Sequence, residues 1–172
     1  MNIKFLTALS LFVIFFSCKQ KEETNLEDNK DNTTISGISE KDISKLNYIE
    51  FTLDEKTEKA IEDWNEYKEL QIIVTNVKKG DLSYFDNEED PIKELMKNAK
   101  QTIPSIVNTD PIIARITVLE TKLYKLEDVS TLLSTSKKEL LESIKEFLES
   151  FSNLNFQMNK KIENDNQNIE KP

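Results

Sequence analysis

The strongest helical pattern in the chain lies at residues 110–158, which read DPIIARITVLETKLYKLEDVSTLLSTSKKELLESIKEFLESFSNLNFQM. Apolar residues recur there at steps of three and four, the spacing of one helix face. They are Ile112, Ile116, Leu119, Leu123, Leu126 and Leu133 in the first half, and Leu140, Ile144, Phe147, Phe151, Leu154 and Met158 in the second. Rows of this kind are the seams of packed helices, and they predict an all-α fold.

The two halves of this stretch are predicted to form a hairpin. The segment Ser134-Thr135-Ser136 contains poor helix formers, and Ser136 with Glu139 makes a capping box for a new helix. The alternative is one continuous helix of about 50 residues, roughly 75 Å long at 1.5 Å per residue, because the apolar phase does not break. A continuous helix would need a partner to cover its far half, whereas the hairpin predicts a monomer.

Two more helices are predicted before this stretch. The first is predicted to begin at the capping box of Thr52 and Glu55, to run to Lys79 and to stop at Gly80. Its apolar stripe consists of Leu53, Ala60, Ile61, Trp64, Tyr67, Leu70, Val74 and Val77. A shorter helix is predicted to open at Asp90-Pro91 and to fade before Pro104, because proline suits the first helical position.

The domain boundaries follow from these elements. Ser39 with Asp42 resembles a capped start and predicts a short helix over residues 40–47. Residues 39–158 are therefore interpreted as an antiparallel helical bundle of three long helices and one shorter helix. Residues 159–172, NKKIENDNQNIEKP, are polar and are predicted to be a frayed tail.

The first 17 residues have the pattern of a secretory signal peptide. Lys4 supplies the positive charge, and the apolar run from Phe5 to Phe16 is shorter than the roughly 20 residues that a membrane span needs. A small residue, Ser17, then precedes Cys18, the one cysteine of the chain. This ending resembles the Phe-Phe-Ser-Cys lipobox of Bacteroidota lipoproteins, and the resemblance implies that Cys18 becomes the acylated N-terminus. The alternative is an ordinary signal peptide with an incidental cysteine.

Residues 18–38 are predicted to form the acylated cysteine and a disordered tether, because residues 19–35, KQKEETNLEDNKDNTTI, contain little apolar surface to bury. The triplet Lys21-Glu22-Glu23 is similar to the signal that directs Bacteroidota lipoproteins to the outer face of the outer membrane. A solvated charge run is the alternative. The expected location is therefore the cell envelope, with the lipid in the outer membrane and the bundle on its periplasmic or surface-exposed face.

The composition excludes several function classes. The formal charge is −9, and removal of residues 1–17, whose one charge is Lys4, makes it −10. A chain this acidic repels nucleic acid. It has no histidine, the commonest general base and transition-metal ligand, and its two glycines are too far apart for a phosphate-binding loop. Its carboxylates fall on polar helix faces without an isolated pair. We therefore expect no enzyme, no cofactor, no metal site and no identifiable small-molecule substrate.

Four further features stand out in the sequence. Tyr84 and Phe85 lie in a predicted loop, where aromatic residues favour a partner surface. Trp64 and Tyr67 could line a ligand groove, although aromatic residues at seam positions are usually core. Arg115 is the one arginine, either paired with a carboxylate beneath the surface or exposed. The acidic residues at 81, 86 and 88–90 could bind calcium, but they lack the spacing of an EF-hand loop and more often form a solvated loop.

The whole pattern resembles the small helical lipoproteins of unknown function that are common in Bacteroidota. The resemblance rests on the lipobox, the acidic tether, the Trp64-x-x-Tyr67 helix, Ile103-Pro104 and the helix around Ile113-Ala114-Arg115-Ile116. It implies a fold and a location but no activity. We expect a non-catalytic binding module of the envelope that attracts a basic protein partner. The alternatives are an immunity-type periplasmic inhibitor of a basic toxin and an envelope-polymer hydrolase that uses carboxylates.

Overall fold

The computed structural model describes residues 37–86 and 91–167. Over these residues the chain forms six α-helices, one 3-10 helix and no strand, which confirms the prediction of an all-α fold. The helices are α2 (Glu40–Ile43), α3 (Glu55–Ala60), α4 (Asn65–Lys78), α5 (Pro91–Gln101), α6 (Asp110–Thr131) and α7 (Lys137–Asn166), with the 3-10 helix η2 (Ser83–Asp86) between α4 and α5. No described helix is both long and apolar enough to cross a membrane. The predicted signal peptide, Cys18 and the triplet Lys21-Glu22-Glu23 lie outside the described residues.

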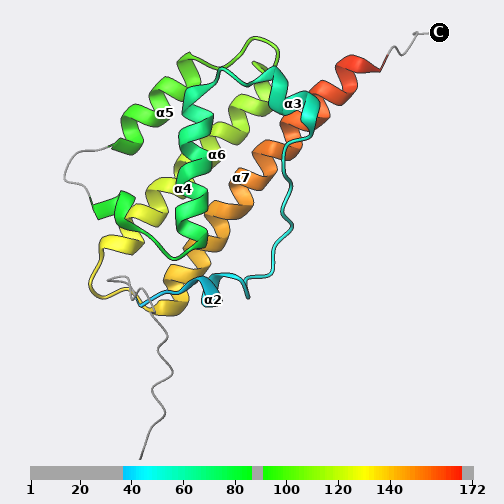
Figure 1. The fold of residues 1–172 in the computed structure, drawn as a ribbon. Coiled ribbons are helices and arrows are strands. Elements are labelled where there is room, and N and C mark those ends of the chain that lie inside the picture. Colours follow the sequence, from blue (N-terminus) through cyan, green and yellow to red (C-terminus); the bar gives the residue numbers. More distant parts are fainter. Residues whose placement is uncertain (1–36, 87–90, 168–172) are drawn as a thin grey trace, which may run out of the picture. The chain divides into compact units, whose positions relative to one another are not determined.

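The two longest helices, α6 and α7, form a hairpin and share the most extensive contact in the fold (Figure 1). The turn at residues 132–136 confirms the predicted break, and the Ser136 hydroxyl accepts the N–H of Glu139 at 3.2 Å, as a helix cap does. Leu133 is wrongly predicted as a seam residue. It lies in the turn with its side chain fully exposed, and Val129 ends the buried face of α6 instead.

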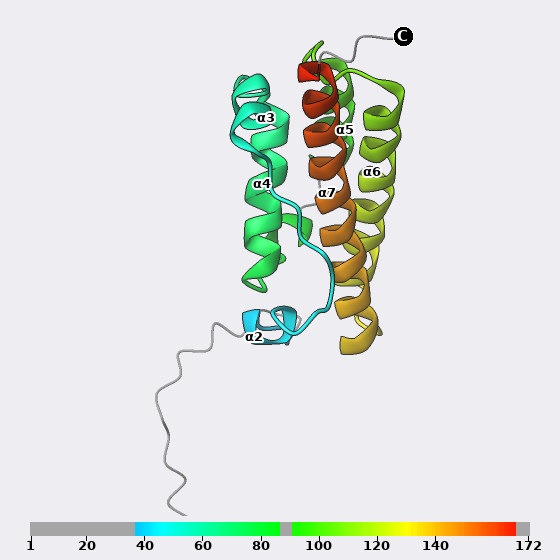
Figure 2. The same ribbon diagram turned by 90° about the vertical axis from the view of Figure 1, so that its right-hand side faces the viewer.

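Helices α4 and α5 complete the main core. Helix α5 packs against both α4 and α6, and α6 packs against α7, so these four helices enclose one core (Figures 1 and 2). As predicted, α4 stops just before Gly80, which has φ +81°. The N–H of Asp81 donates to the carbonyl of Asn76 at 3.0 Å, which is the Schellman ending. A Cβ on Gly80 would lie 2.9 Å from the carbonyl oxygen of Ile38, so glycine also allows the N-terminal segment to approach.

The predicted helix from Thr52 to Lys79 is wrong in its first third. The helix begins at Glu55 under the cap Asp54, whose carboxylate accepts the N–H of Thr57 at 2.7 Å, and it is interrupted between Ile61 and Trp64. The interruption lets α3 pack against α7 while α4 packs against α5. No glycine or proline marks this bend, and the apolar spacing is the same as that of a continuous helix.

Two smaller boundaries also differ from the predictions. Helix α2 is one turn long, not residues 40–47, although the capping contact is present because the Asp42 carboxylate accepts the N–H of Ser39 at 3.1 Å. Lys137 pairs with Asp42 at 2.8 Å and joins α2 to the start of α7. The supposed frayed tail is helical up to Asn166, because Ile162 continues the buried face of α7 four residues after Met158.

Candidate functional site

A segment without helix or strand, residues 46–54, crosses the face of α7 on its way from α2 to α3 (Figure 2). We call it the strap. Because the strap forms no helix or strand, its backbone N–H and C=O groups need hydrogen-bond partners from other parts of the protein or from water. Three polar side chains of α7, those of Ser152, Asn155 and Asn159, bind five of these groups in the strap, and we call these three residues the polar ladder. Their spacing of three and four places them on one face of α7.

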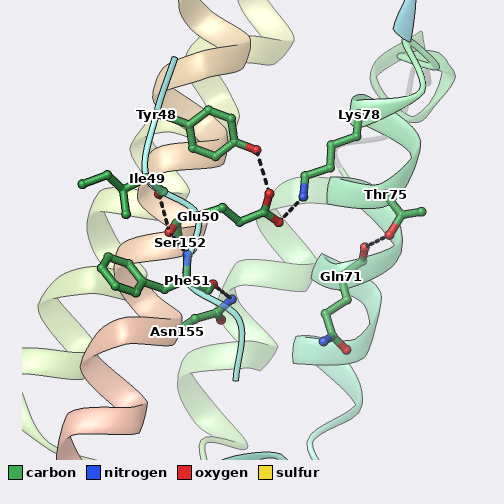
Figure 3. A network of polar contacts seen from close by, with 9 residues as sticks. All are labelled: Tyr48, Ile49, Glu50, Phe51, Gln71, Thr75, Lys78, Ser152 and Asn155. Atoms are coloured by element: carbon green, nitrogen blue, oxygen red, sulfur yellow. Dashed lines mark hydrogen bonds and ion pairs between the residues drawn. The ribbon is translucent and has the colours of Figure 1, made fainter. Parts of the chain in front are cut away.

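The polar ladder binds both donors and acceptors of the strap (Figure 3). The Ser152 hydroxyl accepts the N–H of Phe51 at 2.7 Å and donates to the carbonyl of Ile49 at 2.8 Å. The Asn159 amide donates to the carbonyl of Thr52 at 2.8 Å and accepts the N–H of Asp54 at 3.1 Å. These contacts involve main-chain atoms of the strap, so they fix its path without depending on its side chains.

Asn155 is the junction of three segments. Its amide nitrogen donates to the carbonyl of Phe51 in the strap at 3.0 Å, and its amide oxygen accepts the hydroxyl of Tyr67 in α4 at 2.8 Å. Both side chains are buried, and burial raises the pKa of Tyr67 above its ordinary value. The phenol therefore stays protonated at neutral pH and keeps its role as donor.

A second contact joins the strap to α4. The carboxylate of Glu50 forms an ion pair with the ammonium of Lys78, and the Tyr48 hydroxyl lies 3.4 Å from the same carboxylate (Figure 3). Burial, and then the charge of Glu50, raise the pKa of Tyr48 to about 12. Glu50 and Lys78 are both about a third to a half exposed, so their attraction is screened by water. We call this contact the latch, and it holds the strap far less firmly than the polar ladder does.

Beneath the latch lies a pocket of about 180 Å³ between the strap, α4 and α7. We call it the inner pocket. Its floor is made of buried aromatic and aliphatic side chains, Tyr67, Val74, Leu148 and Phe151. Its α4 wall carries Gln71, Thr75 and Lys78, whose polar groups lie toward solvent.

A second pocket of about 400 Å³ adjoins the first at the bend between α3 and α4. We call it the outer pocket. It shares Leu53, Tyr67 and Gln71 with the inner pocket. The rest of its lining is Glu58, Ile61, Glu62, Asp63 and Lys68. With three carboxylates against one ammonium, the outer pocket favours positively charged groups.

The residues singled out in the sequence fall largely outside this site. Phe85 is 2% exposed and packs into the core, so its prediction as a partner-binding residue is wrong. Tyr84 is half-buried against the core and meets Phe85 edge-on at 5.6 Å, because η2 turns this loop inward onto α6. Arg115 is exposed on α6, in line with the surface alternative.

Trp64 and Tyr67 are core residues, as the more frequent alternative held, but Tyr67 also lines both pockets. Asp81 and Asp86 were calcium candidates together with residues 88–90, which lie outside the described residues. Within residues 37–86 and 91–167, no group of three or more histidine, cysteine or acidic side chains is placed to hold a metal ion.

Sequence reasoning missed the polar ladder. Ser152, Asn155 and Asn159 each follow a seam residue of α7 by one position, in a run, SNLNFQMN, that lacks the lysine and glutamate typical of an exposed helix face. Serine and asparagine at regular spacing beside a seam are poor helix formers that bind backbone elsewhere. This pattern was the available signal.

Comparison with known proteins adds no relative from which a function could be carried over. No protein-family model matches the chain, and neither the curated proteins nor the solved structures contain a significant match to it.

Proposed function

We propose that this chain is a lipid-anchored, non-catalytic binding module of the bacterial cell envelope. In this proposal Cys18 carries the lipid, the residues after it form a tether, and the remainder is an antiparallel bundle of three long helices and one shorter helix. The Lys21-Glu22-Glu23 triplet directs the protein to the outer membrane. The bundle recruits a basic protein partner through the groove formed by the inner and outer pockets.

The groove is the observation that carries the binding proposal. It adjoins a strap whose main chain is fixed by the polar ladder, so its walls are formed before a partner arrives. Its open end has three carboxylates, and the whole chain has a formal charge of −9. Charge of one sign lining a concave surface attracts partners of the opposite sign and raises their association rate.

Charge reversal at the outer pocket tests this function. The full-length protein is used to capture partners from envelope extracts, and the double variant Glu62→Lys, Asp63→Lys is expected to lose about nine-tenths of the captured basic protein, roughly 1.4 kcal/mol of binding. Capture by the unaltered chain should also weaken between about 0.1 and 1 M salt, as the screening length falls.

The matched control is the double variant Asp128→Lys, Glu142→Lys, which changes the net charge by the same amount at exposed residues outside both pockets. It should retain most of the capture. Equal loss in the two double variants would mean that net charge and not the groove attracts the partner. Absence of any specific basic partner would refute the proposed function.

The anchor has its own test. Replacement of Cys18 by alanine is expected to release the protein from membranes or leave it as an uncleaved precursor, because no thiol remains for the lipid. Fractionation of cells gives the readout. A Cys18→Ala variant that matures and stays membrane-bound would remove the lipoprotein part of the proposal.

A further inference from the structure

The inner pocket has the volume of one aromatic ring. At about 180 Å³ it is slightly larger than a cavity of about 150 Å³ in a protein interior that is known to accept benzene. A branched aliphatic chain would also fit by volume, so the lining must decide which kind of group is preferred.

The lining favours a ring. Tyr67 and Phe151 on the floor are stacked on each other, with centroids 5.6 Å apart and planes 17° apart. Trp64 extends the stack behind Tyr67 at 5.7 Å. An aromatic group that enters from the strap side meets the edges or faces of this stack, and such contacts stabilise aromatic pairs beyond their buried area. At the solvent side, the polar groups of Gln71 and Thr75 can bind a phenolic hydroxyl.

The latch allows entry without undoing the strap. Glu50 and Lys78 line the inner pocket, and both are partly exposed, so rotation of the two side chains costs little. The polar ladder holds the strap main chain from the other side, through Ser152, Asn155 and Asn159. A group can therefore enter the inner pocket past these two side chains while the strap main chain stays in place.

The outer pocket favours a positive charge on the ligand next to the aromatic ring. Leu53, Tyr67 and Gln71 line both pockets, so the two pockets adjoin. Neighbouring residues of an extended peptide can therefore place one side chain in each pocket. The outer pocket contributes Glu58, Glu62 and Asp63. A ligand that fills both therefore has an aromatic ring and a cation close together.

We infer that the groove recognises an exposed segment of the partner protein in which a tyrosine or phenylalanine lies beside lysine or arginine. The ring enters the inner pocket and the cation binds in the outer pocket. This inference rests on the proposed function and adds the recognised chemistry to it. A buried aromatic anchor with a charged neighbour is the usual composition of an interaction hot spot.

Trp64 reports on the site. It is the one tryptophan of the chain, it is buried, and it stacks on Tyr67, which lines both pockets. The test titrates the full-length protein with two blocked tripeptides, Lys-Tyr-Lys and Lys-Ala-Lys, and follows tryptophan emission with isothermal calorimetry as a second readout. The tyrosine peptide is expected to bind about tenfold more tightly, because the ring fills the inner pocket.

Two variants of α4 locate the effect. Thr75→Phe places a ring at the mouth of the inner pocket and is expected to abolish the difference between the two peptides. Ile72→Phe is the matched control, since Ile72 is exposed on the same helix and lines neither pocket, and it should preserve the difference. Both sites are exposed, so folding is retained and can be checked by circular dichroism.

A third ligand separates a peptide from a free small molecule. Tyramine carries the phenol ring and the ammonium without a peptide backbone, and it should bind at least about tenfold more weakly than Lys-Tyr-Lys. Tyramine binding as tightly as the peptide would overturn the peptide segment as occupant. Equal binding of the two tripeptides would overturn the inference while leaving salt-sensitive capture, and so the proposed function, intact. Failure of both peptides together with failure of capture would overturn both.

Discussion

Helix α7 is held differently on its two sides. Toward α6 it presents a continuous apolar face that includes Phe147 and Leu154, both fully buried. Toward the strap it presents the polar ladder, whose hydrogen bonds are directional and individually contribute little to stability. The apolar side therefore determines whether the chain folds, whereas the polar side determines where one particular segment lies. A binding groove beside the strap therefore adjoins the less strongly held side of the molecule.

The largest effect is expected on the apolar side. Leu126→Ala should lower the free energy of unfolding by about 2–5 kcal/mol, because Leu126 is fully buried and its truncation leaves a cavity. Urea denaturation measures the loss. Leu133→Ala is the matched control from the same helical phase, and since Leu133 is fully exposed it should change stability by less than about 0.5 kcal/mol. Similar losses in the two variants would contradict the hairpin as described.

An intermediate effect is expected on the polar side. Asn155→Ala should cost about 1–3 kcal/mol, because it removes the acceptor of the buried Tyr67 hydroxyl and the donor to the carbonyl of Phe51. Hydrogen exchange at the Phe51 amide should become faster as the strap loosens. Asn153→Ala, at an exposed position of the same helix, provides the control. If the two variants were equally stable, the polar ladder would not be what holds the strap.

The smallest effect on stability is expected from the charged residues that border the apolar side. Glu146 of α7 accepts from Lys125 at 2.8 Å and from Lys122 at 2.9 Å, and these contacts hold its pKa below the ordinary value. A depressed carboxyl pKa stabilises the fold above the unfolded-state pKa, and this stabilisation is lost as pH falls through the folded-state pKa. Glu146→Gln should therefore cost on the order of 0.5 kcal/mol at neutral pH and nothing in acid below both pKa values.

The control for that measurement is Glu149→Gln, whose partner Lys145 lies on the same helix at 3.8 Å. Denaturation of both variants and the unaltered chain at several pH values gives the comparison. A stability difference for Glu146→Gln that does not change with pH would show that the two lysines do not act through its charge.

Local sequence patterns predict some parts of the fold, whereas tertiary contacts decide others. Helices α5, α6 and α7 were predicted because capping residues such as Ser136 and apolar residues at steps of three and four act within one helix. The break between α3 and α4 was not predicted, since Ile61 and Trp64 keep the apolar spacing of one helix across it. Tertiary contact with α7, which no local pattern of residues 55–64 encodes, decides that bend.

The candidate site was predictable only in part. The aromatic pair Trp64 and Tyr67 stands out in the sequence, whereas the acidic residues that line the outer pocket do not. The inner pocket exists because the strap lies on α7. The hydrogen bonds between them join residues 101 to 107 positions apart. Phe85 illustrates the opposite error, because a loop position suggested exposure and the fold buries it.

The separation along the chain between the strap and α7 has a consequence for the order of folding. The strap is synthesised before α7, yet the side chains that bind five of its backbone groups, those of Ser152, Asn155 and Asn159, belong to α7. Contacts so distant in sequence close late, because the entropy lost in closing the loop must first be offset by the helices between. The α6–α7 hairpin can form from local contacts, and the strap then docks onto it. The groove is thus the last part of the molecule to acquire its shape, and a chain truncated before residue 150 would lack it altogether.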